Sequence, residues 1–159
     1  MIETGQTLPD VELMHATPDG PQKVRTHELF GQGKSVIFAV PGAFTPTCSA
    51  RHLPGFVDHA DDLKAKGVDR IACVSVNDAF VMQAWGESAD AGDKVTLLGD
   101  GNAEFAEALG LTMDGSGFGM GKRSQRYAMV VEDGKVADLF VEEGGGFEVS
   151  SAEHVLSKL

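Results

Sequence analysis

The sequence is poor in cysteine, in basic residues and in long apolar runs, and each shortage excludes a class of protein. Only two of its 159 residues are cysteine, Cys48 and Cys73, which is too few for a structural zinc site with four ligands. Lysine and arginine total 13 against 24 acidic residues, which gives a net charge of −11. We therefore expect neither nucleic acid nor an anionic membrane as a partner. No apolar run reaches the length of a membrane span.

The amino terminus also lacks the pattern of a secretory signal. The stretch "MIETGQTLPD" has no basic region followed by an apolar one, so we expect a cytoplasmic protein. A permanent structural disulfide is not expected in that compartment. The length suits a single compact domain over residues 1–159 with a core of its own.

Strands and helices are predicted to alternate along the centre of the chain. Apolar stretches at 36–40, 71–76 and 95–100 predict strands that are buried on both faces. Helical periodicity follows each of them, and two hairpins, at 11–25 and 126–143, flank this region before a last helix. We expect Thr26 and Asn77 to cap helices. The order predicts an α/β fold with a mixed central sheet and helices on both faces.

The stretch "VIFAVPGAFTPTCS", residues 36–49, places a cysteine at the start of a helix. Its strand ends at Pro41-Gly42, and Thr45-Pro46 is a hydroxyl N-cap followed by proline at the first helical position. Cys48 then lies in the first turn, where free N–H groups and the helix dipole stabilise a thiolate. This layout is typical of thioredoxin-like folds. A lone cysteine after a strand is otherwise a small buried apolar residue.

The spacing between Thr45 and Cys48 narrows the chemistry further. It is the spacing of a Cys-x-x-Cys redox motif in which a hydroxyl replaces the first sulfur. Such a pair cannot form a disulfide, but its hydroxyl can hold an oxygen-bearing substrate against the sulfur. This favours a thiol that attacks oxygen.

Several stretches resemble the peroxiredoxin family, in particular its Prx5 or type II subfamily. These stretches are "PGAFTPTCSARHLPGF", "CVSVND", "FVMQAW" and "RYAMVVEDGKV", and the resemblance covers nearly the whole chain. It implies a thioredoxin-like fold and a homodimeric, thiol-dependent peroxidase that reduces hydrogen peroxide and alkyl hydroperoxides.

The resemblance also implies a role for each residue of the motif. Cys48 would be the peroxidatic cysteine, which becomes a sulfenic acid. Thr45 would hydrogen-bond the peroxide, and Pro41 would shield the sulfenic acid from water. An arginine from a distant strand would stabilise the thiolate and the charge that develops on the peroxide. We expect this to be Arg126, with Arg123 as the second choice.

Two histidines near Cys48 raise other chemistries. His52 shares a helical face with Cys48, but a neighbour on the same helix is poorly aimed as the base of a cysteine protease. His59 would complete a Cys-His-His metal set, yet Pro54-Gly55 is expected to break the shared face. We therefore expect no metal and no cofactor.

Two glycine-rich segments are expected to be mobile loops beside the active site. One is "GSGFGMGKR", which fails the phosphate-binding Walker pattern because Arg123 stands where serine or threonine is required. The other is "EEGGGFEVSS", directly before the last helix.

The second thiol decides which reductant is expected. Some Prx5 proteins carry a resolving cysteine at the position that we align with Val149, and it is absent here. Cys73 lies in the middle of a buried strand, which favours a structural role and places it too far along the sheet to pair with Cys48 in the reduced fold. We expect glutathione with glutaredoxin as the reductant, and thioredoxin as the second choice. The alternatives are a thioredoxin-dependent atypical 2-Cys enzyme that uses Cys73, or a non-enzymatic redox sensor on the same fold.

Overall fold

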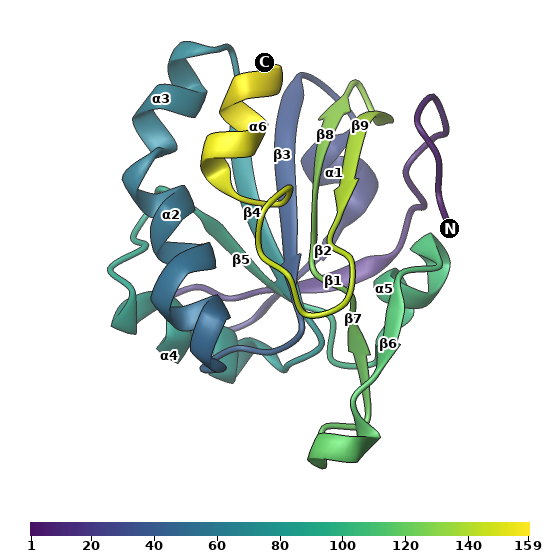
Figure 1. Cartoon of the computed structure of the whole chain (residues 1–159). Helices are drawn as coiled ribbons and strands as arrows, with labels where there is room; N and C mark the ends of the chain where they lie inside the picture. The colour runs from purple at the N-terminus through teal and green to yellow at the C-terminus, as the bar shows by residue number, and fades with distance from the viewer.

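A mixed sheet of seven strands organises the molecule (Figure 1). The computed structural model describes residues 1–159. The strands are β1 (Glu12–His15), β2 (Gln22–Arg25), β3 (Lys34–Val40), β4 (Arg70–Ser75), β5 (Thr96–Gly99), β8 (Tyr127–Glu132) and β9 (Lys135–Val141), in the spatial order β2-β1-β5-β4-β3-β8-β9. The three central strands, β5, β4 and β3, are parallel, and the strands on either side are antiparallel. The predicted mixed sheet is thus confirmed.

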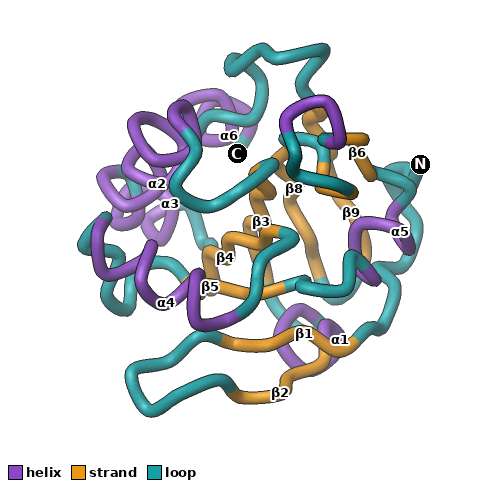
Figure 2. The backbone as a smooth tube through the Cα atoms, turned by 90° about the horizontal axis from the view of Figure 1, so that it is seen from below, coloured by secondary structure: helices purple, strands orange, loops and turns teal.

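Helices cover both faces of this sheet, as Figure 2 shows from below. They are α1 (Thr26–Phe30), α2 (Leu53–Asp58), α3 (Ala60–Ala65), α4 (Ala79–Ser88), α5 (Glu104–Leu109) and α6 (Ala152–Lys158), with a π turn, η1 (Cys48–His52), directly before α2. None of the helices has the length and apolar character needed to cross a membrane.

Strand β3 explains why the sequence "VIFAV" is apolar throughout. Side chains alternate between the faces of a strand. Phe38 accordingly packs in the cluster beneath α2, α3, α4 and α6, while Ile37 packs in the cluster beneath α1 and α5. Both side chains are fully buried, and each such burial stabilises the fold by about 1.5–3 kcal/mol. Cys48 and Cys73 both belong to the first cluster.

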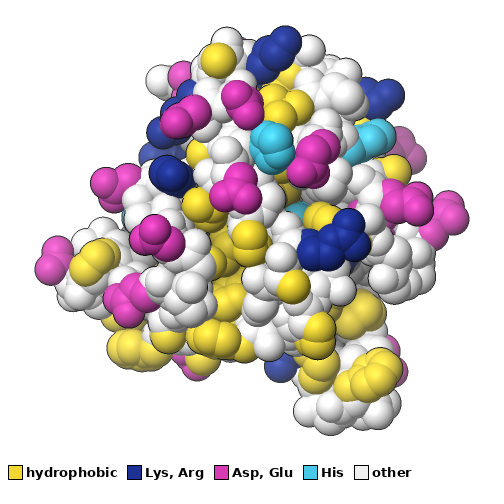
Figure 3. Space-filling view, turned by 60° about the vertical axis from the view of Figure 1, so that its left-hand side comes forward, with side chains coloured by type: hydrophobic (Ala, Val, Ile, Leu, Met, Phe, Trp, Pro, Cys, Tyr) yellow, Lys and Arg dark blue, Asp and Glu magenta, His cyan; other side chains and the backbone are white.

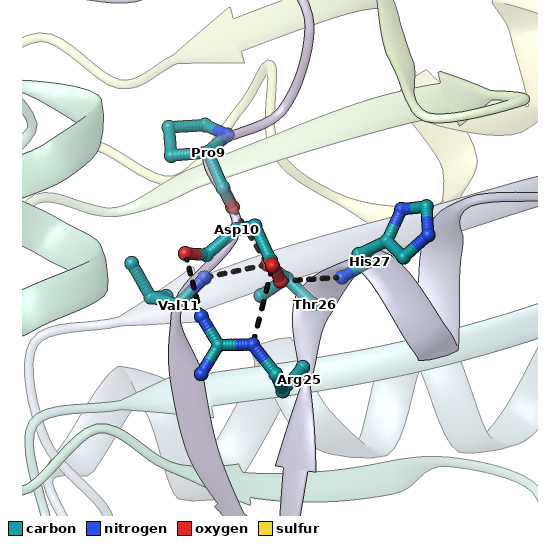
Figure 4. Close-up of polar contacts among 6 residues, drawn as sticks. All are labelled: Pro9, Asp10, Val11, Arg25, Thr26 and His27. Carbon is teal, nitrogen blue, oxygen red and sulfur yellow. Dashed lines mark hydrogen bonds and ion pairs between the residues drawn. The ribbon is translucent and has the colours of Figure 1, made fainter.

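The amino-terminal hairpin is closed by a polar cluster rather than by the predicted helix cap (Figure 4). The Thr26 hydroxyl donates to the carbonyl of Pro9 (2.6 Å) and accepts from the N–H of Val11 (3.0 Å). Arg25 Nε donates to the Asp10 carboxylate at 3.1 Å. Thr26 therefore ties the chain before β1 to the end of β2. The N-cap residue of α1, Arg25, makes no capping bond, and the Asp10 carboxylate instead accepts from the His27 N–H in the first turn at 3.2 Å.

The helix that carries Cys48 is not broken where the sequence predicted. It begins at Pro46 and continues through Pro54-Gly55 to Asp58, with the interruption at His59. In the turn before Pro54 the Leu53 N–H donates to the Cys48 carbonyl five residues back, so the regular α-helical pattern is already interrupted where the proline stands. A π turn of this kind is common at functional sites.

The first glycine-rich segment is also more ordered than predicted. It forms a two-stranded hairpin of β6 (Thr112–Asp114) and β7 (Lys122–Ser124), joined by the short 3₁₀ helix η2 (Ser116–Phe118). Arg123 anchors this hairpin, because its guanidinium donates to the carbonyls of Met120 (2.8 Å) and Val76 (2.9 Å). The short strands lack apolar alternation, so no sequence pattern indicated them.

Candidate active site

Cys48 lies where the sequence predicted, in the first turn of a helix that follows β3. The helix begins at Pro46, and the Ser49 N–H donates to the Thr45 carbonyl at 2.9 Å. The Cys48 side chain is 0% exposed. The π turn starts at this residue and ends at His52, so the irregular geometry is located at the thiol itself.

Arg126 places a permanent positive charge against this sulfur. It directly precedes β8, which pairs with β3, and its Nη2 donates to Cys48 Sγ at 3.1 Å. A fixed guanidinium stabilises a thiolate relative to a thiol. The first choice of arginine from the sequence therefore contacts the sulfur, whereas Arg123 is engaged with backbone carbonyls.

His52 holds the other arm of the same guanidinium. Arg126 Nη1 donates to His52 Nδ1 at 2.8 Å. Because arginine only donates, Nδ1 is the acceptor and the imidazole proton lies on Nε2, which donates to the Ser150 carbonyl at 2.9 Å. Burial and the nearby charge of Arg126 lower the pKa of His52 to about 3. The imidazole is neutral at physiological pH and acts as an acceptor that orients the arginine.

Aromatic rings make the surroundings of His52 apolar. Its ring centroid lies 4.8 Å from that of Phe38, 5.7 Å from that of Phe56 and 5.0 Å from that of Phe147. Arg51 stacks on the outer side of Phe147, with its guanidinium carbon 4.6 Å from the ring centroid. The ring of Phe147 thus separates the inner polar groups from solvent.

The loop from Pro41 to Thr45 is held tightly beside the thiol. The Thr45 hydroxyl donates to the Gly42 carbonyl at 2.7 Å, which leaves its oxygen lone pairs able to accept from a substrate. A Cβ on Gly42 would lie only 3.1 Å from the Met120 side chain and 3.2 Å from the Thr45 methyl group, so a larger residue would have to displace these neighbours. Pro41 is half-buried at the start of the loop, directly after β3.

Asn77 fixes this loop to the end of β4 and does not cap a helix as predicted. Its side-chain oxygen accepts from the Ala43 N–H (3.0 Å) and from the Ser75 hydroxyl (2.6 Å). The cap of α4 is Asp78, whose carboxylate accepts from the Val81 N–H at 2.9 Å. Asn77 and Asp78 are both residue types that commonly cap helices. The loop at Ala43 occupies the Asn77 side chain, so Asp78 is the cap.

The glycine-rich loop before α6 is pinned near the site rather than free. Glu142 is buried, and its Oε2 accepts from the Glu148 N–H (2.8 Å), the Ser150 N–H (2.8 Å) and the Ser150 hydroxyl (2.6 Å). Burial opposes ionisation of this carboxyl, but the hydrogen bonds from Ser150 and Glu148 outweigh it and lower its pKa. The loop therefore carries a buried carboxylate that the sequence analysis missed.

Cys73 has no such polar surroundings. It lies in the middle of β4, opposite Phe38 of β3, and it is 0% exposed. Burial, reinforced by the proximity of Cys48, raises the pKa of the Cys73 thiol well above its ordinary value. Both cysteines are free thiols, and Cys73 is held in the protonated, unreactive form.

The structure does not bring His59 to the thiol. His59 lies on the surface, where it pairs with Asp62 (3.1 Å) and Glu153 (3.2 Å). No group of three metal-binding side chains occurs in the structure. The interruption that separates His59 from Cys48 is at His59 itself, not at Pro54-Gly55 as predicted.

Together these groups form a buried nucleophile with a fixed cation. The Cys48 sulfur can attack an electrophilic atom, and Arg126 can stabilise negative charge that develops on an oxygen beside it. Of the contacts found, the sequence indicated the Cys48 helix turn from its residues. The part played by His52, Glu142 and Ser150 had no signal beyond their residue types.

Comparison with known proteins points in the same direction. The family model described as Redoxin matches residues 3–156. The chain is 56% identical over 163 residues to peroxiredoxin-2E-2, chloroplastic, of Oryza sativa subsp. japonica, which covers 99% of this chain and 72% of that relative. It is 48% identical over 159 residues to peroxiredoxin-2C of the same organism, which covers 99% and 98%. The solved structure of reduced Prx3 from Vibrio vulnificus in complex with H2O2 matches with a TM-score of 0.95 and 56% identity, covering 99% of both chains.

Proposed function

Because the chain belongs to the peroxiredoxins, in the Prx5 or type II subfamily, and is a thiol peroxidase, we propose that Cys48 is its peroxidatic cysteine and that glutathione with glutaredoxin regenerates it. The observation that carries the first part is the 3.1 Å contact between Arg126 Nη2 and Cys48 Sγ in a site without exposed sulfur. No comparable donor faces the other thiol.

The proposed step transfers one oxygen from peroxide to sulfur. The Cys48 thiolate donates an electron pair to a peroxide oxygen, so that an S–O bond forms as the O–O bond breaks. Sulfur is oxidised by two electrons to sulfenic acid. The departing oxygen takes a proton and leaves as water or an alcohol. Arg126 stabilises the negative charge on the oxygens in the transition state.

Thr45 and Pro41 complete the proposed site. The Thr45 hydroxyl proton is already donated to Gly42, so its oxygen accepts the hydrogen bond of the peroxide O–H. Pro41 flanks the same loop as a residue without an N–H and limits the approach of water to the sulfenic acid. Hydrogen peroxide and alkyl hydroperoxides are the proposed substrates. The H2O2 named with the Vibrio vulnificus relative supports the first of them.

The choice of reductant follows from the second thiol. Cys73 is buried in β4 and protonated, and the loop before α6 contains no cysteine. We therefore expect an external thiol to resolve the sulfenic acid. Glutathione condenses with it, releasing water and leaving a mixed disulfide, and the glutaredoxin thiolate then takes the glutathionyl group and frees Cys48.

The test compares two complete reducing systems. Peroxide-dependent oxidation of glutathione is measured with and without glutaredoxin, and then with thioredoxin in their place. Turnover that requires glutaredoxin supports the proposal. Turnover with thioredoxin alone, lost in Cys73→Ser, would instead identify an atypical 2-Cys enzyme that resolves through Cys73.

We also propose a homodimer formed near the active site. Three phenylalanines are unusually exposed for their type: Phe44 (55%), Phe80 (72%) and Phe118 (86%). They lie on the active-site loop, at the start of α4 and in η2. Hydrophobic side chains also gather along the lower part of the face in Figure 3. Exposed apolar groups of this size favour a protein partner. Light scattering at micromolar concentration should give twice the 16.8 kDa chain mass, and Phe80→Asp should reduce it.

A cytoplasmic location remains part of the proposal. Two free thiols and no disulfide suit a reducing compartment. Fractionation of the source cells with antibody detection tests this directly.

A further inference from the structure

A closed ring of hydrogen bonds joins the active-site arginine to the loop before α6. It runs from Arg126 Nη1 to His52 Nδ1 (2.8 Å) and from His52 Nε2 to the Ser150 carbonyl (2.9 Å). It continues from the Ser150 N–H and hydroxyl to Glu142 Oε2 (2.8 and 2.6 Å). It closes through the backbone, because the Glu142 N–H donates to the carbonyl of Arg126 itself at 3.0 Å.

Each member of this ring is buried or partly buried, and each of its charged groups is hydrogen-bonded within the protein. Ser150 and His52 are 0% exposed, and Glu142 is 8% exposed. A buried carboxylate is costly unless it is hydrogen-bonded, and Glu142 receives three such bonds, two of them from Ser150. The position of the Ser150 carbonyl is thereby fixed, and with it the orientation of the imidazole.

We propose that Glu142 is a positioning residue for the peroxidase reaction, acting through Ser150 and His52 to aim the Arg126 guanidinium at the Cys48 sulfur. It touches neither sulfur nor peroxide. The guanidinium has two arms in this arrangement, one on the sulfur and one on the imidazole. If the imidazole turns, the second arm loses its acceptor and the first arm is no longer fixed. The inference rests on the proposed role of Arg126.

The test separates hydrogen bonding by Glu142 from its charge and from general stability. The rate constant for oxidation of reduced Cys48 by hydrogen peroxide is measured by competition with a haem peroxidase, together with the thermal midpoint of each variant. Glu142→Ala should slow the reaction about tenfold or more, the size typical of outer partners in a site. Glu142→Gln keeps the length and an accepting oxygen, so it should stay within about threefold of the parent. Glu142→Asp keeps the charge but withdraws the oxygen from Ser150, so it should be slower than Glu142→Gln.

The neighbouring carboxylate supplies the matched control. Glu143 is exposed and its side chain makes no hydrogen bond, so Glu143→Ala should leave the rate within about twofold of the parent. A purely structural role for Glu142 would lower the thermal midpoint of Glu142→Ala while leaving its rate constant within about twofold of the parent, and that result overturns the inference. If Glu142→Ala does not fold, the rate constants of Glu142→Gln and Glu142→Asp decide. A Glu142→Asp that reacts faster than Glu142→Gln overturns the inference.

A second background links the effect to the arginine. In Arg126→Lys, whose single ammonium cannot hold both acceptors in one plane, adding Glu142→Ala should slow the reaction by less than about twofold. An equal loss in both backgrounds overturns the inference. If Arg126→Lys oxidises slowly but Glu142→Ala reacts at the parental rate, the inference about Glu142 is wrong and the proposed site stands. If Arg126→Lys itself reacts at the parental rate, the proposed site is wrong as well.

Discussion

Cys48 and Cys73 lie in the same hydrophobic cluster and neither has exposed surface, yet their polar surroundings are opposite. Cys48 opens a helix and receives a guanidinium hydrogen bond at 3.1 Å. Cys73 lies in mid-strand, where burial raises its pKa well above the ordinary value. Burial therefore does not distinguish the two thiols. The guanidinium hydrogen bond does, because it reaches only Cys48.

The difference also supports the proposed resolution by an external thiol. A thiol kept protonated in a sheet is a poor nucleophile. An attack by Cys73 on an oxidised Cys48 would start from mid-strand, where the thiol has no exposed surface. On the proposed route, the buried Cys48 sulfur would have to become accessible to a tripeptide thiol, which is much larger than hydrogen peroxide.

The largest expected effect comes from exchanging sulfur for oxygen at each position. Cys48→Ser should lower peroxidase turnover by about 10⁴-fold or more, because the hydroxyl lacks the nucleophilicity of a thiolate. Cys73→Ser should keep most of the turnover with glutathione and glutaredoxin. A coupled assay of NADPH oxidation measures both variants. If Cys73→Ser is inactive in this assay, Cys73 is not merely structural and both thiols take part in the reaction.

The next effect separates the two arginines near the site. Arg126→Lys should slow Cys48 oxidation by about 10²- to 10³-fold, the loss typical of one donor to a developing oxyanion. Arg123→Lys, which changes only the bonds to the Met120 and Val76 carbonyls, should slow it far less. Rapid-mixing measurements of peroxide consumption compare the two. Equal losses would place the second arginine in the site too.

A smaller effect should appear in the acid stability of the fold. The folded pKa of His52 is about 3 and its ordinary value is 6.5, so between these values the unfolded chain binds a proton that the folded chain does not. The contribution of His52 to the free energy of unfolding is fully present above about pH 6.5. It is lost as the pH falls toward 3, by at most about 1.4 kcal/mol per pH unit. Urea unfolding between pH 4.5 and 6.5 should show a flatter slope in His52→Phe than in the parent.

His59 supplies the control of opposite sign. Its pKa is raised, chiefly by the hydrogen bond to Asp62, so its contribution is present below pH 6.5 and is lost as the pH rises through the folded value. His59→Asn should therefore alter the slope above pH 6.5 rather than below it. A His52→Phe slope identical to that of the parent would show that the buried imidazole does not contribute to acid unfolding.

The smallest effect concerns the packing of the second thiol. Cys73→Ala removes one buried atom from the cluster and should destabilise the fold by about 1 kcal/mol, with peroxidase turnover unchanged. Thermal unfolding measures the shift. A loss of turnover with no loss of stability would show that the sulfur of Cys73 takes part in the reaction.

Local patterns sufficed for most of the fold and for one half of the site. The apolar run of β3, the Pro41-Gly42 stop and the Thr45-Pro46 helix start are encoded within a few residues, so the place of Cys48 was predictable. Arg126 was selected from the resemblance, because an arginine before a strand is ordinarily a solvated group. Its contact with Cys48 depends on the pairing of β8 with β3, which links distant segments.

The ring through Glu142 could not be predicted for a similar reason. Its members come from η1, the edge of β8, the end of β9 and the loop before α6. From its sequence alone, the glycine-rich segment 142–151 was predicted to be mobile. Its order comes from the hydrogen bonds between Glu142 and Ser150, which form only once the sheet has placed the end of β9. The short strands β6 and β7 were missed because three residues carry too little periodicity.

The hydrogen bond between Trp85 and Ser49 places a natural fluorescence probe on the helix turn that carries Cys48. Trp85 is the only tryptophan, it is fully buried, and its indole N–H donates to the hydroxyl of Ser49 at 2.9 Å. Ser49 is the residue next to Cys48. An opening of the turn to admit a thiol would break this bond and place the indole in a more polar environment. The intrinsic fluorescence of the chain is therefore dominated by one indole bonded to that turn, and its emission would report an opening of the turn directly.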